Sequence, residues 1–119
     1  MIEFKMPWPP SVNGYWKPFN NRLIISARGR KYRANAIAQL IDLKLYNKKL
    51  SQSLSVELVL NPPTLARYDI DNFNKALFDA LSHGKFWLDD EQVVELKIVK
   101  GVKTKGGNIE LIIKELNHE

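Results

Sequence analysis

The sequence predicts a single α+β domain in which two main helices pack against a mixed β-sheet. Four segments alternate apolar and polar residues with the period of a half-buried strand, and two longer segments carry apolar residues at helical spacing. No repeat, low-complexity segment or linker divides the chain, so one domain is expected over residues 1–119.

The N-terminal part is predicted to form a strand and then a hairpin. Residues 2–8 alternate apolar and polar side chains, and the two prolines that follow end this strand. An Asn-Gly turn signal at residues 13–14 precedes two short apolar segments on either side of residues 18–21. A hairpin or an ordered loop is therefore expected here.

The first main helix is predicted over residues 27–48, with Ser26 as its N-cap. Four cations crowd its first turns, where they oppose the helix dipole. They could hold an anion such as phosphate or simply form a solvated face, and the sequence leaves both readings open. The cations are Arg28, Arg30, Lys31 and Arg33, and the apolar stripe of the helix is expected to comprise Ala34, Ile37, Ala38, Ile41 and Leu45.

The second half of the chain is predicted to contain a strand, a helix and two further strands. Residues 55–60 alternate again and are followed by two prolines, and a second helix is expected over residues 71–82. Residues 92–100 and 108–115 then predict a hairpin around residues 103–107.

The composition excludes several classes of site. The chain has no cysteine, which rules out disulfides, zinc ribbons and thiol catalysis, and its two histidines are too few for a histidine-rich zinc site. Any metal must therefore bind to oxygen ligands. The net charge of +5 suits a polyanionic partner. Because no secretory signal and no apolar run of roughly 18 residues is present, a soluble cytoplasmic protein is expected.

The candidate chemistry lies in residues 67–75 and 88–91, which are rich in aspartate. Asp69 and Asp71 point the same way if the backbone is extended, and Asp90 could complete a three-carboxylate site for Mg²⁺. Repulsion among three carboxylates is relieved mainly by a bound cation. Carboxylate-bound Mg²⁺ activates water and neutralises charge on a phosphate, so these residues predict cleavage of a phosphodiester.

Lys75 follows Asp71 by one helical turn and could hold the scissile phosphate or stabilise the leaving oxygen. A helical wheel groups Lys75 with Asp79, opposite the apolar stripe Phe73, Ala76, Leu77, Ala80 and Leu81. Phe78 falls on the polar side of the wheel. There it could join a dimer contact, approach DNA or pack under a neighbouring loop.

Each of these residues also has a purely structural alternative. Either aspartate of the D-x-D-N segment could cap the second helix. Lys75 could do no more than pair with Asp71 and Asp79 at helical spacing. Asp89 and Asp90 could form an ordinary turn. The spacing of the aspartates alone occurs by chance and does not decide between these alternatives.

Motifs spread over almost the whole chain occur together in one known family. They are Trp8-Pro9-Pro10-Ser11 with Asn13, the D-I-D-N-x-x-K segment at 69–75, Phe78-Asp79-Ala80-Leu81, the run from Phe86 to Val94, and Lys103-Thr104-Lys105-Gly106-Gly107. Several rare residues stand in the same order and at the same spacing as in that family. In these motifs the sequence resembles the RusA family of Holliday junction resolvases, small endonucleases found in bacteria and their prophages.

The resemblance implies a homodimer that binds four-way DNA junctions and makes paired, symmetric, magnesium-dependent cuts. By position, the essential aspartates of the family resemble Asp69, Asp71 and Asp90, and its functional lysine resembles Lys75. Mn²⁺ is expected to substitute for Mg²⁺. Two equivalent sites related by a two-fold axis supply a physical reason for the dimer, because one domain with one site cannot place two symmetric nicks.

One segment departs from the family pattern. A run of arginines precedes the first aspartate in the best-known member, whereas Arg67 is the single cation of residues 64–68 here. Arg67 could still contact phosphate, and Tyr68 could stack on a base. The cations at residues 28–33 could compensate for the missing arginines. Asn72 and Asp89 are expected to support the catalytic residues through hydrogen bonds.

The prediction is therefore a magnesium-dependent endodeoxyribonuclease, encoded by a bacterium or a phage, that resolves four-way junctions in DNA recombination and repair. Two alternatives stay open. One is a junction-binding protein with weak or no cleavage, although a pure DNA binder gains nothing from carboxylates near phosphate. The other is a nuclease for flaps, forks or RNA, which would share the same metal chemistry.

Overall fold

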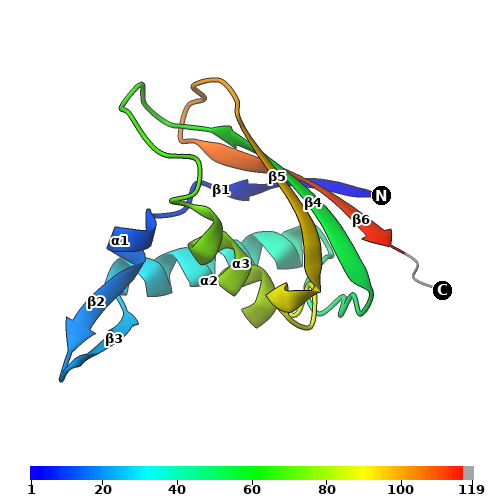
Figure 1. Ribbon diagram of the computed structural model, residues 1–119, viewed down its shortest axis with the longest axis horizontal. Coiled ribbons are helices and arrows are strands. Elements are labelled where there is room, and N and C mark those ends of the chain that lie inside the picture. The colour runs from blue at the N-terminus through cyan, green and yellow to red at the C-terminus, as the bar shows by residue number, and fades with distance from the viewer. Residues whose placement is uncertain (117–119) are drawn as a thin grey trace.

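A four-stranded mixed sheet is covered on one face by two helices in the computed structural model, which describes residues 1–116 (Figure 1). The predicted α+β architecture is thus confirmed. None of the helices within residues 1–116 has the length and apolar composition needed to cross a membrane. In chain order the elements are β1 (Ile2–Pro7), α1 (Val12–Tyr15), β2 (Trp16–Phe19), β3 (Arg22–Ile25), α2 (Ala27–Asp42), β4 (Ser53–Asn61), α3 (Asn74–His83), the 3₁₀-helix η1 (Asp90–Gln92), β5 (Val93–Lys100) and β6 (Asn108–Leu116).

The sheet places β4 between β5 and β6, so the predicted hairpin of the last two strands is wrong. The strand order is β1-β6-β4-β5, with β4 parallel to β5 and antiparallel to β6. Alternation locates a strand and its buried face but does not identify its neighbours. The chain leaves β5 over the end of β4, where Gly101 N–H donates to Leu60 O at 2.7 Å and Val102 N–H donates to Asn61 Oδ1 at 3.2 Å.

The core lies between the sheet and the helices. Every second residue of β4 from Leu54 to Leu60 is buried, and so are the alternate residues of β6 from Ile109 to Ile113. Phe4 and Met6 extend this surface into β1, as their alternation predicted. The hairpin of β2 and β3 projects from one end of the layers with α1 at its base (Figure 1).

Helix α2 ends at Asp42 and not at residue 48, and it is rotated relative to the prediction. Ser26 caps it as expected, because its Oγ accepts from Gly29 N–H at 2.9 Å. Lys44 then adopts a left-handed conformation with φ of 60°, which ends the helix. The buried stripe is Gly29, Tyr32, Ala36 and Leu40, whereas the predicted Ala34, Ala38 and Ile41 are exposed and Ile37 and Leu45 are partly buried.

The rotation of α2 follows from two close contacts. The Tyr32 hydroxyl donates to Pro7 O at 2.9 Å, which turns this side chain inward to the end of β1. Gly29 faces the backbone of α1, where a Cβ would lie 2.8 Å from Tyr15 O. Glycine and tyrosine are only weakly apolar, so the spacing of the strongly apolar residues predicted the wrong buried face for α2.

Helix α3 begins at Asn74, three residues later than predicted. Its apolar stripe is confirmed, since Ala76, Leu77, Ala80 and Leu81 are all buried. Phe78 is buried too, with its ring edge-on to Trp87 at 5.2 Å between centroids. Of the three roles open for Phe78, packing under the segment that follows α3 is the one observed.

Candidate active site

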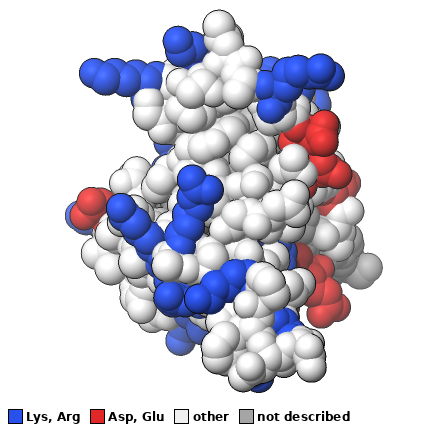
Figure 2. Space-filling model, turned by 90° about the vertical axis from the view of Figure 1, so that its left-hand side faces the viewer, with Lys and Arg blue, Asp and Glu red and all other residues white. Residues whose placement is uncertain are grey.

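Several basic side chains lie on the face that carries the hairpin and the start of α2. Figure 2 shows lysine and arginine side chains across the lower part and at the upper corners of this face, and carboxylates mainly along one margin. Arg28 and Lys31 line an open pocket of about 390 Å³ beside the aromatic side chains of Trp8 and Phe73. Two of the predicted phosphate contacts thus border a concave surface with aromatic walls.

The other two cations of α2 are engaged within the protein. Arg30 Nη1 donates to Ile25 O at 3.0 Å, a contact on the surface of the hairpin. Arg33 Nη2 donates to the hydroxyl of the fully buried Tyr15 at 3.1 Å, and its buried Nε has no hydrogen-bond partner. Arg33 therefore points into the molecule and away from a DNA backbone.

Asp69 and Asp71 are exposed in the turn that leads into α3. The turn is closed by Asn72 N–H, which donates to Asp69 O at 3.3 Å, and it is tied to α1 by Val12 N–H, which donates to Asn72 O at 2.7 Å. Phe73 occupies the N-cap position of α3, and no side chain caps that helix. The helix-cap alternative for the two aspartates is therefore wrong, and Asn72 supports the turn through its backbone.

Asp90 is the first residue of η1, and Asp89 is its N-cap. Asp89 Oδ1 accepts from Glu91 N–H at 2.9 Å, and Gln92 completes a capping box with Asp89. This backbone hydrogen bond, followed by one from the Asp90 carboxyl, lowers the pKa of Asp89. Asp89 has a clear structural role, since it fixes the short helix that carries Asp90.

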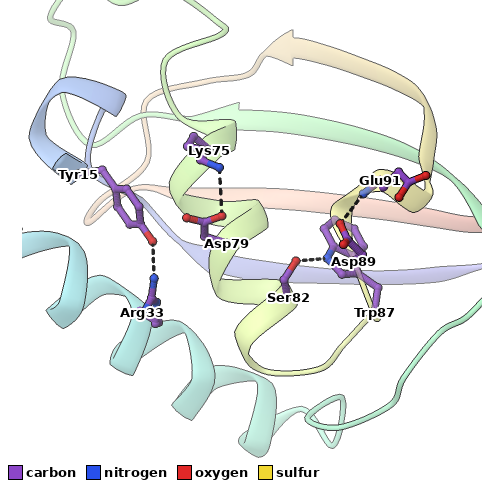
Figure 3. Close-up of polar contacts among 8 residues, drawn as sticks. All are labelled: Tyr15, Arg33, Lys75, Asp79, Ser82, Trp87, Asp89 and Glu91. Carbon is purple, nitrogen blue, oxygen red and sulfur yellow. Dashed lines mark hydrogen bonds and ion pairs between the residues drawn. The ribbon is translucent and has the colours of Figure 1, made fainter. Parts of the chain in front are cut away.

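Lys75, Asp79 and Asp90 come together at one side of α3. Lys75 Nζ lies 3.4 Å from Asp79 Oδ1, as Figure 3 shows, and 5.9 Å from the centroid of the Trp16 ring. The predicted pairing of Lys75 with Asp79 is confirmed, and within residues 1–116 Lys75 forms no ion pair with Asp71. An open pocket of about 340 Å³ is lined by Lys75, Asp79, Ser82, His83, Lys85, Leu88, Asp89 and Asp90.

Asp90 carries an unfavourable charge in this pocket. Burial is the largest cause that raises its pKa, and the neighbouring Asp89 and Asp79 act in the same direction, while Lys75 lowers it. A bound cation would reverse this effect. Carboxylate oxygens are also the ligands that Mg²⁺ prefers, so the donor set suits a hard divalent ion.

The three predicted metal ligands come from two separate segments. Asp69 and Asp71 lie in the turn before α3, and Asp90 lies in η1. Within residues 1–116, no three histidine, aspartate or glutamate side chains lie close enough together to hold a metal ion. The structure thus brings Asp90 to Lys75, while the set of three aspartates stays a prediction.

Asp90→Asn is expected to raise the melting temperature of the metal-free protein at pH 7. Because its pKa is raised on folding, ionised Asp90 destabilises the folded state at every pH above the unfolded value of about 3.9. The asparagine removes this penalty, so a higher melting temperature than that of the wild type is expected. The gain should shrink as the pH falls through the raised pKa of the folded state, and little of it should remain at pH 4, close to the unfolded value.

Thermal unfolding in EDTA at pH 7 and at pH 4 measures this effect. Asp89→Asn is the matched control with the opposite sign, because a lowered pKa stabilises the folded state above the unfolded value. A lower melting temperature for Asp90→Asn at pH 7 would show that the Asp90 charge is favourable in the absence of metal.

Tyr68 packs into an aromatic cluster, and a cation covers its ring. Its ring centroid lies 5.9 Å from that of Trp8 and 5.7 Å from that of Phe73. Lys100 Nζ donates to Tyr68 O at 2.9 Å and lies 4.5 Å from the ring centroid. Base stacking by Tyr68 stays a prediction, as does a phosphate contact by the exposed Arg67.

Sequence reasoning missed three residues near the site: Tyr15, Trp16 and Lys100. Lys100 ends β5, and it reaches Tyr68 because β5 pairs with β4 in parallel, an arrangement that alternation did not predict. Tyr15 and Trp16 lie where α1 meets β2, about sixty residues before α3 in the sequence. The only feature of the sequence that could have pointed to Tyr15 and Trp16 is that two aromatic residues directly follow the Asn-Gly turn.

Comparison with known proteins identifies the family. The family model described as Endodeoxyribonuclease RusA matches residues 7–114. The chain is 41% identical over 114 residues to the crossover junction endodeoxyribonuclease RusA of Escherichia coli K12, and 42% identical to that of Enterobacteria phage 82. Each alignment covers 96% of this chain and 94% of the relative. The chain therefore belongs to the RusA family of endodeoxyribonucleases.

Proposed function

We propose that this protein is a divalent-metal-dependent endodeoxyribonuclease that resolves four-way DNA junctions by paired, symmetric cuts. The observation that carries the proposal is the open pocket in which Asp90 lies beside Lys75, in a chain 41% identical to crossover junction endodeoxyribonucleases. A carboxylate with a raised pKa next to a lysine suits a site that binds a cation and a phosphate together.

Asp69, Asp71 and Asp90 would hold the ion, which we take to be Mg²⁺ with Mn²⁺ as a substitute. When bound, the ion would lower the pKa of a water molecule and offset charge on the phosphate. Lys75 lies 3.4 Å from Asp79 with its side chain 46% exposed, so its ammonium can reach a phosphate oxygen at the pocket. It would stabilise the charge that develops when water attacks phosphorus and the bond to the leaving oxygen breaks.

The basic face is the proposed path of the DNA backbone. Arg28 and Lys31 border the pocket beside Trp8 and Phe73, and they would contact phosphates on the face shown in Figure 2. Exposed Arg67 would add a contact next to the turn with Asp69 and Asp71. Arg33 is assigned no DNA contact, because it binds the buried Tyr15 hydroxyl.

Incubation with labelled four-way, forked and linear DNA tests the proposal. Paired cuts across the four-way junction are expected with Mg²⁺ or Mn²⁺ and no cuts in EDTA. Retention of the junction in a gel shift without any cut in either ion would favour a junction-binding protein. Preferential cutting of forks or flaps in competition with junctions would favour the second alternative, a nuclease for other branched substrates.

We further propose that the active form is a homodimer that joins through β5. This strand lies at the edge of the sheet and directly follows η1, which carries Asp90. Three large apolar side chains are exposed around it: Leu88 at 50%, Val94 at 56% and Leu96 at 43%. A second copy that pairs along β5 would cover the open edge and place two equivalent sites about one two-fold axis.

Leu96→Glu is expected to convert the dimer into a monomer, because it places charge at the centre of the proposed interface. Sedimentation at micromolar concentration measures the change, and junction cutting should become slower and unpaired. Leu65→Glu is the matched control, since Leu65 is 84% exposed in the loop after β4 and lies outside β5. A Leu96→Glu protein that still sediments as a dimer would rule out β5 as the interface.

A further inference from the structure

We propose that Asp79 is a positioning residue that holds the Lys75 ammonium beside the pocket. The inference rests on the proposed function for the role of Lys75 at the phosphate. It adds a fourth aspartate to the site, one that lies outside the predicted metal set and acts through a neighbouring side chain.

The contact between Lys75 and Asp79 is asymmetric. Their charged atoms are 3.4 Å apart at i,i+4 on α3, and the Asp79 side chain is 20% exposed whereas that of Lys75 is 46% exposed. The carboxylate is therefore the more buried member of the pair and the ammonium the more exposed one. Pairs at this spacing contribute little to stability, so loss of the pair should affect the position of the ammonium more than the free energy of unfolding.

Tyr15 lies close enough to Asp79, on the side of α1, for the two to interact electrostatically. The Tyr15 hydroxyl accepts from Arg33 Nη2 at 3.1 Å, as Figure 3 shows, and this ring is fully buried. Burial raises the pKa of Tyr15; the hydrogen bond from Arg33 lowers it, whereas the nearby charge of Asp79 raises it. The phenol thus accepts from Arg33 of α2 and lies within electrostatic reach of the Asp79 carboxylate on α3.

Lys75 has a second carboxylate within electrostatic reach. Lys75 and Asp90 line the same open pocket, and Lys75 Nζ lies 5.9 Å from the Trp16 ring centroid. Asp90 must stay available to a cation, so a lysine that neutralised it would block the site. Asp79 gives the ammonium a separate partner one turn along α3 and leaves Asp90 free of an ion pair within 4.0 Å in residues 1–116.

Asp79→Asn tests the positioning role through the split between cleavage and binding. We expect the single-turnover cleavage rate to fall about 10- to 100-fold, with junction affinity in Ca²⁺ unchanged within about twofold. Asp79→Glu should restore most of the rate, because it keeps the carboxylate. Glu57→Gln is the matched control, since it breaks the other ion pair of the described residues, Lys97–Glu57 at 3.5 Å, on the sheet.

A double mutant tests whether Asp79 acts through Lys75. If it does, Asp79→Asn combined with Lys75→Met should cleave no more slowly than Lys75→Met alone. Multiplicative losses in the double mutant would overturn the proposal. Tyr15→Phe, which removes only the hydroxyl, should reduce the rate less than Asp79→Asn does.

A measurement without DNA or metal separates this inference from the proposed function. The ¹⁵Nζ signal of Lys75, assigned by its loss in Lys75→Met, should change in shift and in order parameter in Asp79→Asn and not in Glu57→Gln. An unchanged Lys75 signal would overturn the positioning role even if the protein cuts junctions. If the wild-type protein cuts no DNA, the proposed function is overturned. The ¹⁵Nζ measurement would still test the positioning role of Asp79.

Discussion

Asp71→Asn is expected to reduce the single-turnover rate of junction cleavage on the order of 10³-fold while junction binding stays within about threefold of the wild type. Asparagine keeps the size of the side chain and removes the charge that a divalent ion requires. Binding should persist because an exposed carboxylate repels phosphate, and its loss does not remove a cationic contact. Quenched-flow cleavage in Mg²⁺ and gel shift in Ca²⁺ measure the two effects separately.

The structure makes this experiment sharper than the sequence alone would. Had Asp71 capped α3, asparagine would have preserved the cap and alanine would have reduced the free energy of unfolding by about 1 kcal/mol. Phe73 holds the N-cap position instead, so both Asp71→Asn and Asp71→Ala should melt within about 2 °C of the wild type. Full cleavage by either variant in Mg²⁺ would remove Asp71 from the metal site.

Asp42→Asn provides the control for a simple loss of surface charge. Asp42 is the last residue of α2, is exposed and lies outside both pockets described above. Its replacement should leave the cleavage rate and the junction affinity unchanged. A similar loss of cleavage in Asp42→Asn and Asp71→Asn would indicate a nonspecific effect of net charge.

The positions of the strands could be predicted from the sequence, because a strand that is buried on one face carries an apolar side chain at every second residue. Leu54 to Leu60 and Ile109 to Ile113 show this period in the sequence and in the core. Their pairing did not follow, since parallel contact between β4 and β5 depends on a crossover through α3 and η1. A hairpin was predicted because strands that are consecutive in the sequence usually pair with each other. The crossover makes β5 pair with β4 instead.

In the candidate site, too, the local contacts could be predicted from the sequence and the contacts between distant segments could not. The i,i+4 relation of Lys75 to Asp79 is a property of the helix, so the sequence predicted it and the structure confirmed it. The approach of Asp90 to this pair depends on how the segment after α3 folds back. Arg33 of α2 binds Tyr15 of α1, which lies within electrostatic reach of Asp79, and no local pattern encodes contacts between segments so far apart in the sequence.

The segment that returns from α3 to Asp90 is anchored by Trp87. This side chain is fully buried, with its ring 5.2 Å from that of Phe78 and 5.9 Å from that of Phe86. Its Nε1–H donates to Ser82 Oγ at 2.7 Å, as Figure 3 shows. An isolated bridge joins Trp87 to Leu50. Trp87 stands three residues before Asp90, so its packing sets where η1 begins.

Trp87→Ala is expected to lower the free energy of unfolding by about 3–5 kcal/mol, because it leaves a cavity that the surrounding aromatic rings cannot fill. Trp87→Phe keeps much of the volume and loses the hydrogen bond, and Ser82→Ala loses only the hydrogen bond, for which about 1 kcal/mol is expected. Urea unfolding at pH 7 measures all three. If packing of the indole anchors the segment, Trp87→Ala should also slow cleavage by the folded protein, because the loss of packing lets η1 and Asp90 move away from Lys75. Ser82→Ala keeps this packing and should not slow cleavage. Equal losses of stability in Trp87→Ala and Ser82→Ala would mean instead that the hydrogen bond to α3, and not the packing of the indole, holds Asp90 at the site.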